Sequence, residues 1–158
     1  MVFEDSTKGL LYPDFDDLLR CHELVINISG GLDGVRDENL LRGPLELITY
    51  DRYYKTFAKK ISHLVYTIAK NHGFVDGNKR TAIAVGAFFM EINMFPQQFV
   101  DAFFWGMENP VLLASAGLIS KSELEIIAND LIVDGKFSST SEEIIAGIDP
   151  SKVQELLR

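Results

Sequence analysis

The apolar residues of the chain recur mainly with the spacing of helices. The clearest case is residues 56–70, where the apolar side chains fall at i, i+4, i+7, i+8 and i+11. These positions are Phe57, Ile61, Leu64, Val65 and Ile68. No stretch alternates apolar and polar residues for long enough to indicate a strand. The pattern therefore predicts an all-α fold.

Helix boundaries follow from capping residues and turn residues. Asp14, with Asp17 three residues later, is a good helix start, and Ser120 with Glu123 has the spacing of a capping box. Gly43-Pro44 is a candidate break or kink in the second helix. The predicted helices cover residues 14–28, 37–48, 56–70, 78–93, 98–109 and 120–133.

The helix expected over residues 78–93 is apolar on nearly all sides, which places it at the centre of the core. No internal repeat, low-complexity tract or linker rich in Pro, Gly or Ser divides the chain. We therefore expect one domain, followed by a helical tail that Asp149 caps, with Pro150 in its first turn.

Composition and charge exclude several classes of function. The longest near-apolar run, residues 82–90, is half the length of a membrane span, and the N-terminal residues do not resemble a signal peptide. The single cysteine, Cys21, cannot form an intrachain disulfide, which fits a reducing compartment. A net charge of -8 disfavours binding to nucleic acid or to anionic membranes. We expect a cytoplasmic protein.

The charge is unevenly distributed. Residues 52–80 contain seven basic residues and one acidic residue, Asp76, so a basic segment stands in an acidic protein. Such a segment is what an anion-binding site requires. The simpler interpretation for Lys55, Lys59 and Lys60 is a solvated helix face.

The loop between the two best-predicted helices, residues 72–80, reads His-Gly-Phe-Val-Asp-Gly-Asn-Lys-Arg. The helix that starts at Asn78 offers unpaired backbone N–H groups to a phosphate, and Gly77 allows a close approach of the backbone. Arg80 and Lys79 add positive charge, and Asp76 is a candidate Mg²⁺ ligand. The loop is therefore a candidate phosphate site.

At the other end of the loop, His72 is a candidate general base, because an imidazole can accept a proton from a hydroxyl near neutral pH. Phe74 is expected to point inward and anchor the loop. Each of these residues alone has a common structural explanation, such as a helix cap or a turn.

Together, these residues closely resemble the motif of the Fic/Doc family, His-x-Phe-x-(Asp/Glu)-(Gly/Ala)-Asn-(Gly/Lys)-Arg, at all seven of its specified positions. Gly30-Gly31, Leu40-Leu41 and the segments 34–37 and 117–120 resemble the death-on-curing (Doc) toxin branch. The resemblance covers about residues 14–133. It defines a catalytic domain over residues 1–133 and leaves residues 134–158 as a tail.

The resemblance implies a single-domain helical bundle with the active loop between two central helices. It implies ATP and Mg²⁺ as cofactors and a Ser, Thr or Tyr hydroxyl of another protein as acceptor. In this sequence, His72 would be the base and Asp76 the metal ligand. Gly77 and Asn78 would form the anion hole, and Arg80 would clamp the phosphates.

Two positions depart from the commoner family pattern. Gly73 replaces the proline of many members, which is expected to loosen the loop. Lys79 replaces the glycine of members that transfer AMP, and no second arginine follows at residues 82–85. In the Doc branch, this lysine accompanies a reversed nucleotide and transfer of the terminal phosphate. The resemblance therefore favours a kinase toxin with an antitoxin partner, whose family precedent phosphorylates a translation elongation factor.

Two alternatives stay open, namely a protein AMP-transferase and a catalytically silent binding module of the same fold. His22 and His63 are assigned to packing or surface, because no further ligand stands at the spacing of a metal site. Tyr50, Tyr53 and Tyr54 are assigned to packing, and the sequence Phe103-Phe104-Trp105, at helical spacing, is expected to lie in the core. Glu143 and Glu155 only vaguely resemble the glutamate of the family's inhibitory motif, so we do not expect the tail to inhibit the site.

Overall fold

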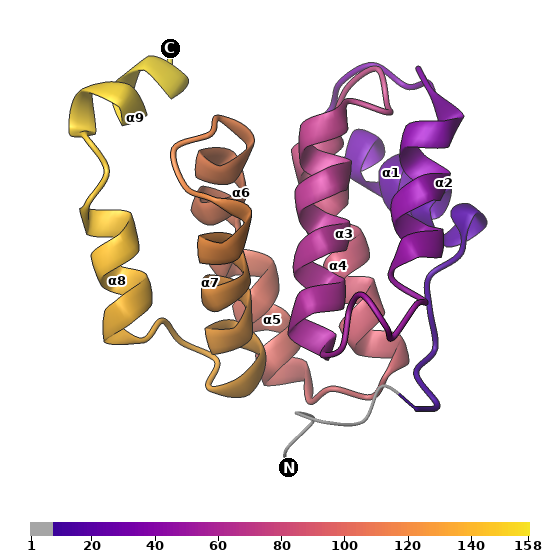
Figure 1. The fold of residues 1–158 in the computed structure, drawn as a ribbon. Helices are drawn as coiled ribbons and strands as arrows, with labels where there is room; N and C mark the ends of the chain where they lie inside the picture. Colours follow the sequence, from indigo (N-terminus) through magenta and orange to yellow (C-terminus); the bar gives the residue numbers. More distant parts are fainter. Residues whose placement is uncertain (1–7) are drawn as a thin grey trace.

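The computed structural model describes residues 8–158, which form nine α-helices and contain no strand (Figure 1). The helices are α1 (Phe15–Ser29), α2 (Glu38–Leu47), α3 (Phe57–Asn71), α4 (Asn78–Ile92), α5 (Gln97–Gly106), α6 (Glu108–Ser115), α7 (Lys121–Val133), α8 (Ser139–Ala146) and α9 (Pro150–Leu156). The all-α prediction is confirmed. None of the helices in this part of the chain is both long and apolar enough to cross a membrane.

Six of the nine described helices begin at a residue whose side chain caps them. Asp14 and Asp17 form a capping box at the start of α1, and Ser120 and Glu123 form another at the start of α7. The side chain of Thr56 accepts the first hydrogen bond at α3. Each cap satisfies backbone N–H groups that have no partner inside the helix.

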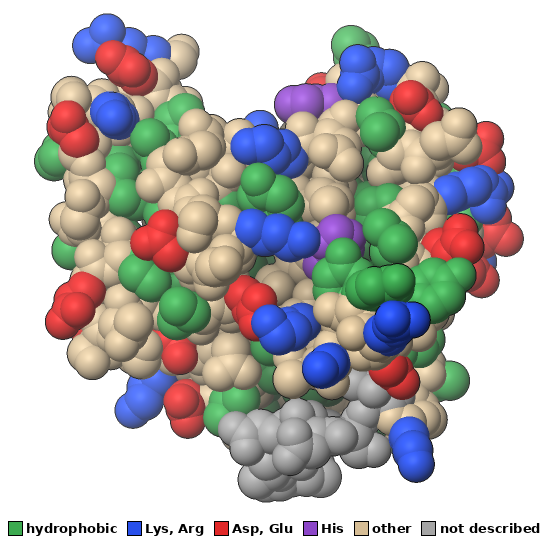
Figure 2. Space-filling model, viewed as in Figure 1, with side chains coloured by type: hydrophobic (Ala, Val, Ile, Leu, Met, Phe, Trp, Pro, Cys, Tyr) green, Lys and Arg blue, Asp and Glu red, His purple; other side chains and the backbone are tan. Residues whose placement is uncertain are grey.

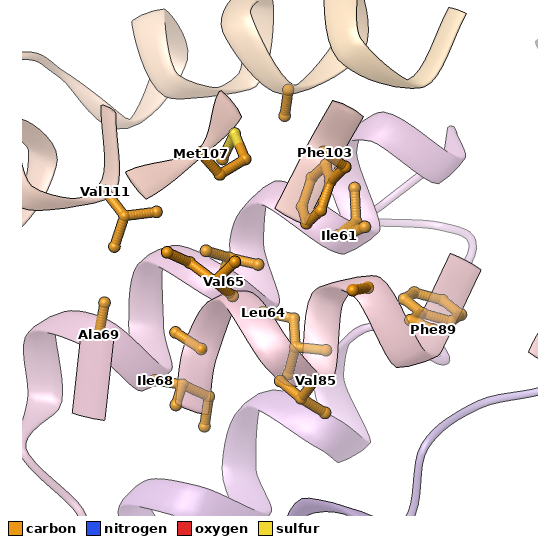
Figure 3. Close-up of a cluster of buried hydrophobic side chains, with 14 of the residues drawn as sticks. Ile61, Leu64, Val65, Ile68, Ala69, Val85, Phe89, Phe103, Met107 and Val111 are labelled. Atoms are coloured by element: carbon orange, nitrogen blue, oxygen red, sulfur yellow. The ribbon is translucent and has the colours of Figure 1, made fainter. Parts of the chain in front are cut away.

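The helices α3 and α4 pack side by side at the centre of the bundle (Figure 1). The helices α1 and α2 flank them on one side, and α5, α6 and α7 flank them on the other. Apolar side chains from α3, α4, α5 and α6 interlock in this core (Figure 3). Residues 72–77 join the two central helices, so the helices that form the centre of the core carry the candidate loop.

Two helical features differ from the prediction. The helix α6 is not among the predicted helices; no side chain caps its start, and Pro110 stands in its first turn, where a proline costs no hydrogen bond. The helix α2 continues through Pro44 and ends only three residues later, at Leu47.

Two predictions about side chains were wrong. Lys60 does not belong to a solvated face, because its side chain is fully buried and its Nζ donates to the Ile48 carbonyl at 2.6 Å and to Asp51 Oδ1 at 2.8 Å. Phe103 is buried in the core, but Trp105 is 72% exposed and Phe104 is also exposed. The aromatic run is therefore core at only one of its three positions.

The tail, residues 134–158, forms α8 and α9 on the outer side of α7 (Figure 1). Asp130 of α7 accepts hydrogen bonds from Ser138 and from Ser141, whose side chain is buried. Asp149 caps α9, with Pro150 as its first residue, as predicted. Apolar residues of the tail, including Ile144 and Ile145, pack against the core.

Candidate functional site

The first residue of the candidate loop, His72, ends α3 in a left-handed conformation, with φ 54° and ψ 48°. A residue with a side chain adopts this conformation at a cost of about 1–3 kcal/mol, so surrounding contacts must hold it there. Arg36 provides two of them, because its Nε donates to the His72 carbonyl at 2.7 Å and its Nη2 to the Asn71 carbonyl at 3.3 Å. The His72 imidazole itself is exposed.

The centre of the loop is closed by Asn78. Its Oδ1 accepts from the Phe74 N–H at 2.9 Å, and its Nδ2 donates to the Phe74 carbonyl at 3.0 Å. Both polar ends of a buried amide are thereby satisfied, and Phe74 is only 1% exposed. The side chain of Asn78 fixes the shape of the loop, so its contribution to an anion hole would come from its backbone N–H.

A residue of α1, His22, contacts the loop on its buried side. Its ring is stacked on the Phe74 ring, with centroids 3.8 Å apart and planes 2° from parallel. The His22 Nε2 lies 2.8 Å from the Asp76 carbonyl. Because a carbonyl only accepts, this nitrogen carries the proton. His22 is therefore a buried support for the loop backbone.

The Asp76 carboxylate faces the concave side of the loop. Its Oδ1 accepts from the Gly77 N–H at 2.7 Å, and its Oδ2 accepts from the Leu32 N–H at 3.1 Å. These backbone hydrogen bonds, with a smaller contribution from Arg80, lower the pKa of Asp76 below its ordinary value. The carboxylate is thus ionised at neutral pH and stays partly exposed.

The start of α4 supplies the positive end of the site. Gly77 precedes the helix with a left-handed φ of 75°, a conformation that glycine adopts without strain. Thr81 donates its N–H to the Gly77 carbonyl, so the N–H groups of residues 78–80 belong to the first turn, which has no intrahelical acceptor. Arg80 donates to the Gly30 carbonyl at 3.1 Å and lies 4.0 Å from Asp76 Oδ1.

The segment between α1 and α2 runs beside the loop. Val35 and Phe74 form an antiparallel β-bridge, and the N–H groups of Arg36 and Asp37 both donate to the Gly73 carbonyl. A Cβ at Gly73 would lie 2.4 Å from Leu41 Cδ2. Gly73 therefore permits close packing of the loop on α2, where the Cβ of a proline would collide with Leu41. Its expected loosening of the loop stays a prediction.

A family model described as Fic/DOC family matches residues 12–90, which include α1, α2, α3, the loop and most of α4. The chain belongs to the Fic/DOC family. Members of this family generally transfer nucleotide-derived groups to proteins. The match does not distinguish the Doc branch from other Fic proteins. No curated protein matches the chain.

The fold brings the predicted Fic residues to one end of the bundle. His72, Asp76, Gly77, Lys79 and Arg80 all lie on the loop or on the first turn of α4. Their chemical roles stay predictions. Sequence reasoning missed His22 and Arg36 as loop supports, because both lie far from the motif along the chain and no local pattern links them to it.

The Asp76 and Arg80 side chains fit a Mg²⁺-bound nucleotide. Each Asp76 oxygen accepts one protein hydrogen bond, which leaves lone-pair capacity, and an ionised oxygen ligand suits a hard cation. Arg80 uses one nitrogen for Gly30 and holds Asp76 only at 4.0 Å, so other N–H groups are available to phosphate oxygens. Among residues 8–158, no cluster of three or more potential ligands forms a protein-only metal site.

Glu143, the candidate inhibitory residue, lies elsewhere. It lines a cleft of about 410 Å³ between the start of α7 and the tail, together with Leu118, Glu123 and Ile148. The expectation that the tail does not inhibit the site stays a prediction.

Proposed function

We propose that this Fic protein is a kinase, which transfers the terminal phosphate of ATP to a Ser, Thr or Tyr hydroxyl of another protein. The observation that carries the proposal is the arrangement of the loop. An exposed imidazole at His72 stands at one end, and a helix N-terminus with Lys79 and Arg80 stands at the other. The two hydrogen bonds between the Asn78 side chain and the Phe74 backbone, which we call the clamp between Asn78 and Phe74, fix the course of the loop between these two ends.

In this proposal, the acceptor hydroxyl oxygen attacks the γ-phosphorus as its proton passes to the His72 imidazole. The bond between the γ-phosphorus and the bridging oxygen breaks, and ADP leaves. The first-turn N–H groups of α4 and the Arg80 guanidinium bind phosphate oxygens. Asp76 would hold a Mg²⁺ ion, which neutralises phosphate charge when bound.

The choice of γ-phosphate rests on Lys79. This residue is the second of α4, where a glycine would leave the first turn open. Its length and charge favour placing the terminal phosphate, rather than the α-phosphate, at the helix start. The proposal also includes a neutralising antitoxin as a partner, because the kinase branch of the family acts as a toxin.

The test compares transfer of label from α- and γ-labelled ATP to proteins of a cell lysate. We expect the wild-type chain to transfer the γ-label alone. His72→Asn is the matched control, because asparagine tolerates the left-handed backbone of residue 72 but cannot accept the proton. It should melt at the wild-type temperature and transfer no label.

The other results are equally informative. Transfer of the α-label alone would make the protein an AMP-transferase and overturn the kinase proposal. No transfer of either label, with unchanged biological effects in His72→Asn, would indicate a silent binding module.

A further inference from the structure

The face of α3 that lies beside α7 carries a row of basic and aromatic side chains. Lys59, His63, Tyr66 and Lys70 recur at i, i+4, i+7 and i+11, so they share one face of the helix. We call this row, together with Tyr54 and Lys121, the α3 stripe. Figure 2 shows Lys and Arg side chains following one another down the hollow between the two halves of the molecule, with histidine beside them.

The centre of the stripe is a set of contacts between three segments. Lys121, the first residue of α7, places its Nζ 2.5 Å from His63 Nδ1, and Tyr54 places its hydroxyl 3.2 Å from the same atom. Burial, with a smaller contribution from Lys121, lowers the pKa of His63 to about 4. His63 is therefore a neutral acceptor at pH 7, and Lys121 is the donor.

Aromatic rings hold two of the three stripe lysines. The Nζ of Lys121 lies 5.7 Å from the Tyr54 ring centroid and 5.9 Å from that of Tyr66. The Nζ of Lys70 lies 5.6 Å from the Tyr66 ring centroid. A freely solvated lysine face would not keep its side chains in such contacts, so the ammonium groups are partly oriented before any ligand arrives.

The stripe keeps a positive charge in a protein with a net charge of -8. Helix α3 contains no acidic residue. Among residues 8–158, the acidic side chain that faces the stripe lysines is Glu125 of α7, which pairs with Lys59 at 3.1 Å and also acts electrostatically on Lys121. Lys70 and Lys121 therefore leave a surplus of positive charge along the hollow.

The stripe leads to the candidate site. Lys70 stands two residues before His72, and the span from Lys59 to Lys70 is about 16 Å at 1.5 Å per residue. An extended peptide covers this length with about five residues. We propose that the α3 stripe binds an acidic segment, about five residues long, of the protein whose hydroxyl His72 activates; this inference rests on the proposed function.

The charge of the whole molecule favours a peptide over a longer polyanion. A short acidic segment contacts only the stripe, whereas a nucleic acid would extend over the surrounding acidic surface. The aromatic rings between the lysines also suit a peptide, because the aliphatic parts of its side chains can pack on them.

The experiment measures binding of a fluorescent peptide, five glutamates followed by a threonine, by anisotropy in the absence of ATP. The double variant Lys70→Gln/Lys121→Gln should raise the Kd about tenfold, the size expected from losing two partly exposed ion pairs. Lys136→Gln is the matched control, because it removes an exposed charge between α7 and α8 and should leave the Kd unchanged. Lys70→Gln alone, at an exposed site, should raise the Kd about threefold even if the double variant folds poorly.

Several outcomes would overturn the inference. The first is that a peptide with glutamine in place of glutamate binds as tightly as the glutamate peptide. The second is that a twelve-nucleotide oligothymidylate displaces the labelled peptide more strongly than the unlabelled peptide does. The third is that the stripe variants bind the peptide with the wild-type Kd. Because the assay needs no ATP, it separates the two proposals. If the protein transfers label but its peptide binding does not depend on the stripe, this inference alone is overturned. If peptide binding depends on the stripe but no label is transferred, the proposed kinase function is overturned.

Discussion

The His22 ring lies flat on the Phe74 ring, 3.8 Å away between centroids, while its Nε2 donates to the backbone carbonyl of Asp76. One side chain of α1 thus holds both the hydrophobic anchor of the loop and the backbone of its carboxylate residue. The position of the Asp76 carboxylate depends on this contact as well as on its own hydrogen bonds.

Replacing His22 by phenylalanine should retain the stacked ring but remove the hydrogen bond to Asp76. We expect the free energy of unfolding to fall by about 1 kcal/mol and the transfer rate to fall about tenfold, because the loop backbone loses one buried partner. Thermal melting and label-transfer rates measure the two effects. An unchanged rate with an unchanged affinity for Mg²⁺ would show that His22 does not position Asp76.

Arg80→Ala should remove most of the affinity for ATP while leaving the fold intact. The Arg80 side chain is 40% exposed and its partners are one carbonyl and a distant carboxylate, so its contribution to stability is below about 1 kcal/mol. Titration calorimetry with a non-hydrolysable ATP analogue should show a Kd at least about tenfold higher. Arg52→Ala, which removes an exposed charge away from the loop, should bind normally. A large drop in melting temperature without ligand would mean that Arg80 is structural.

Lys79→Gly should reduce transfer of the γ-label and admit some transfer of the α-label. Removing the lysine opens the first turn of α4, so the nucleotide gains a second pose. The ratio of α- to γ-label on the target protein measures the change. If the ratio stayed at its wild-type value, Lys79 would not determine which phosphate is transferred.

Stability should fall as the pH drops from about 6.5 to about 4, because His63 binds a proton in the unfolded chain before it does so in the folded one. The difference between these pKa values corresponds to about 3 kcal/mol. Urea titrations at pH 7, 5.5 and 4 follow the loss. In Lys121→Met, the pKa of His63 should rise and the loss should become smaller. Equal acid sensitivity in this variant would exclude coupling between the two residues.

Deleting residues 134–158 should lower stability without changing the activity of the molecules that remain folded. The deletion exposes the face of α7 that the tail covers and removes the partners of Asp130. We expect a loss of about 3 kcal/mol, from the apolar surface that returns to water. Ser141→Ala, which removes one of these hydrogen bonds, should cost only about 1 kcal/mol. A marked rise in transfer rate after the deletion would show instead that the tail inhibits the site.

The elements that carry the site could be predicted because their signals are local. The helices α3 and α4 follow from apolar spacing and capping residues, and the loop between them follows from its motif. The helix α6 was not predicted, because no capping side chain marks its start, and Pro110 costs no hydrogen bond in its first turn.

The contacts that hold the site depend on tertiary structure. His22 is an ordinary helical residue in sequence, and only the packing of α1 against α4 places it under Phe74. In the sequence, Lys60 resembles a surface residue. Only the folded structure shows that the segment after α2 places a carbonyl and a carboxylate beside its ammonium group. The periodic spacing of apolar residues does not reveal which side chains or carbonyls of another helix or loop a residue will contact.

The clamp between Asn78 and Phe74 has a consequence for how this loop can change in evolution. The clamp and the β-bridge between Val35 and Phe74 together fix how many residues separate α3 from α4. One inserted residue would break the clamp or turn the start of α4 by about 100°, which would carry Arg80 away from Asp76. Relatives are therefore free to exchange side chains at exposed positions such as Val75, but an insertion or a deletion between His72 and Asn78 should abolish the site at once.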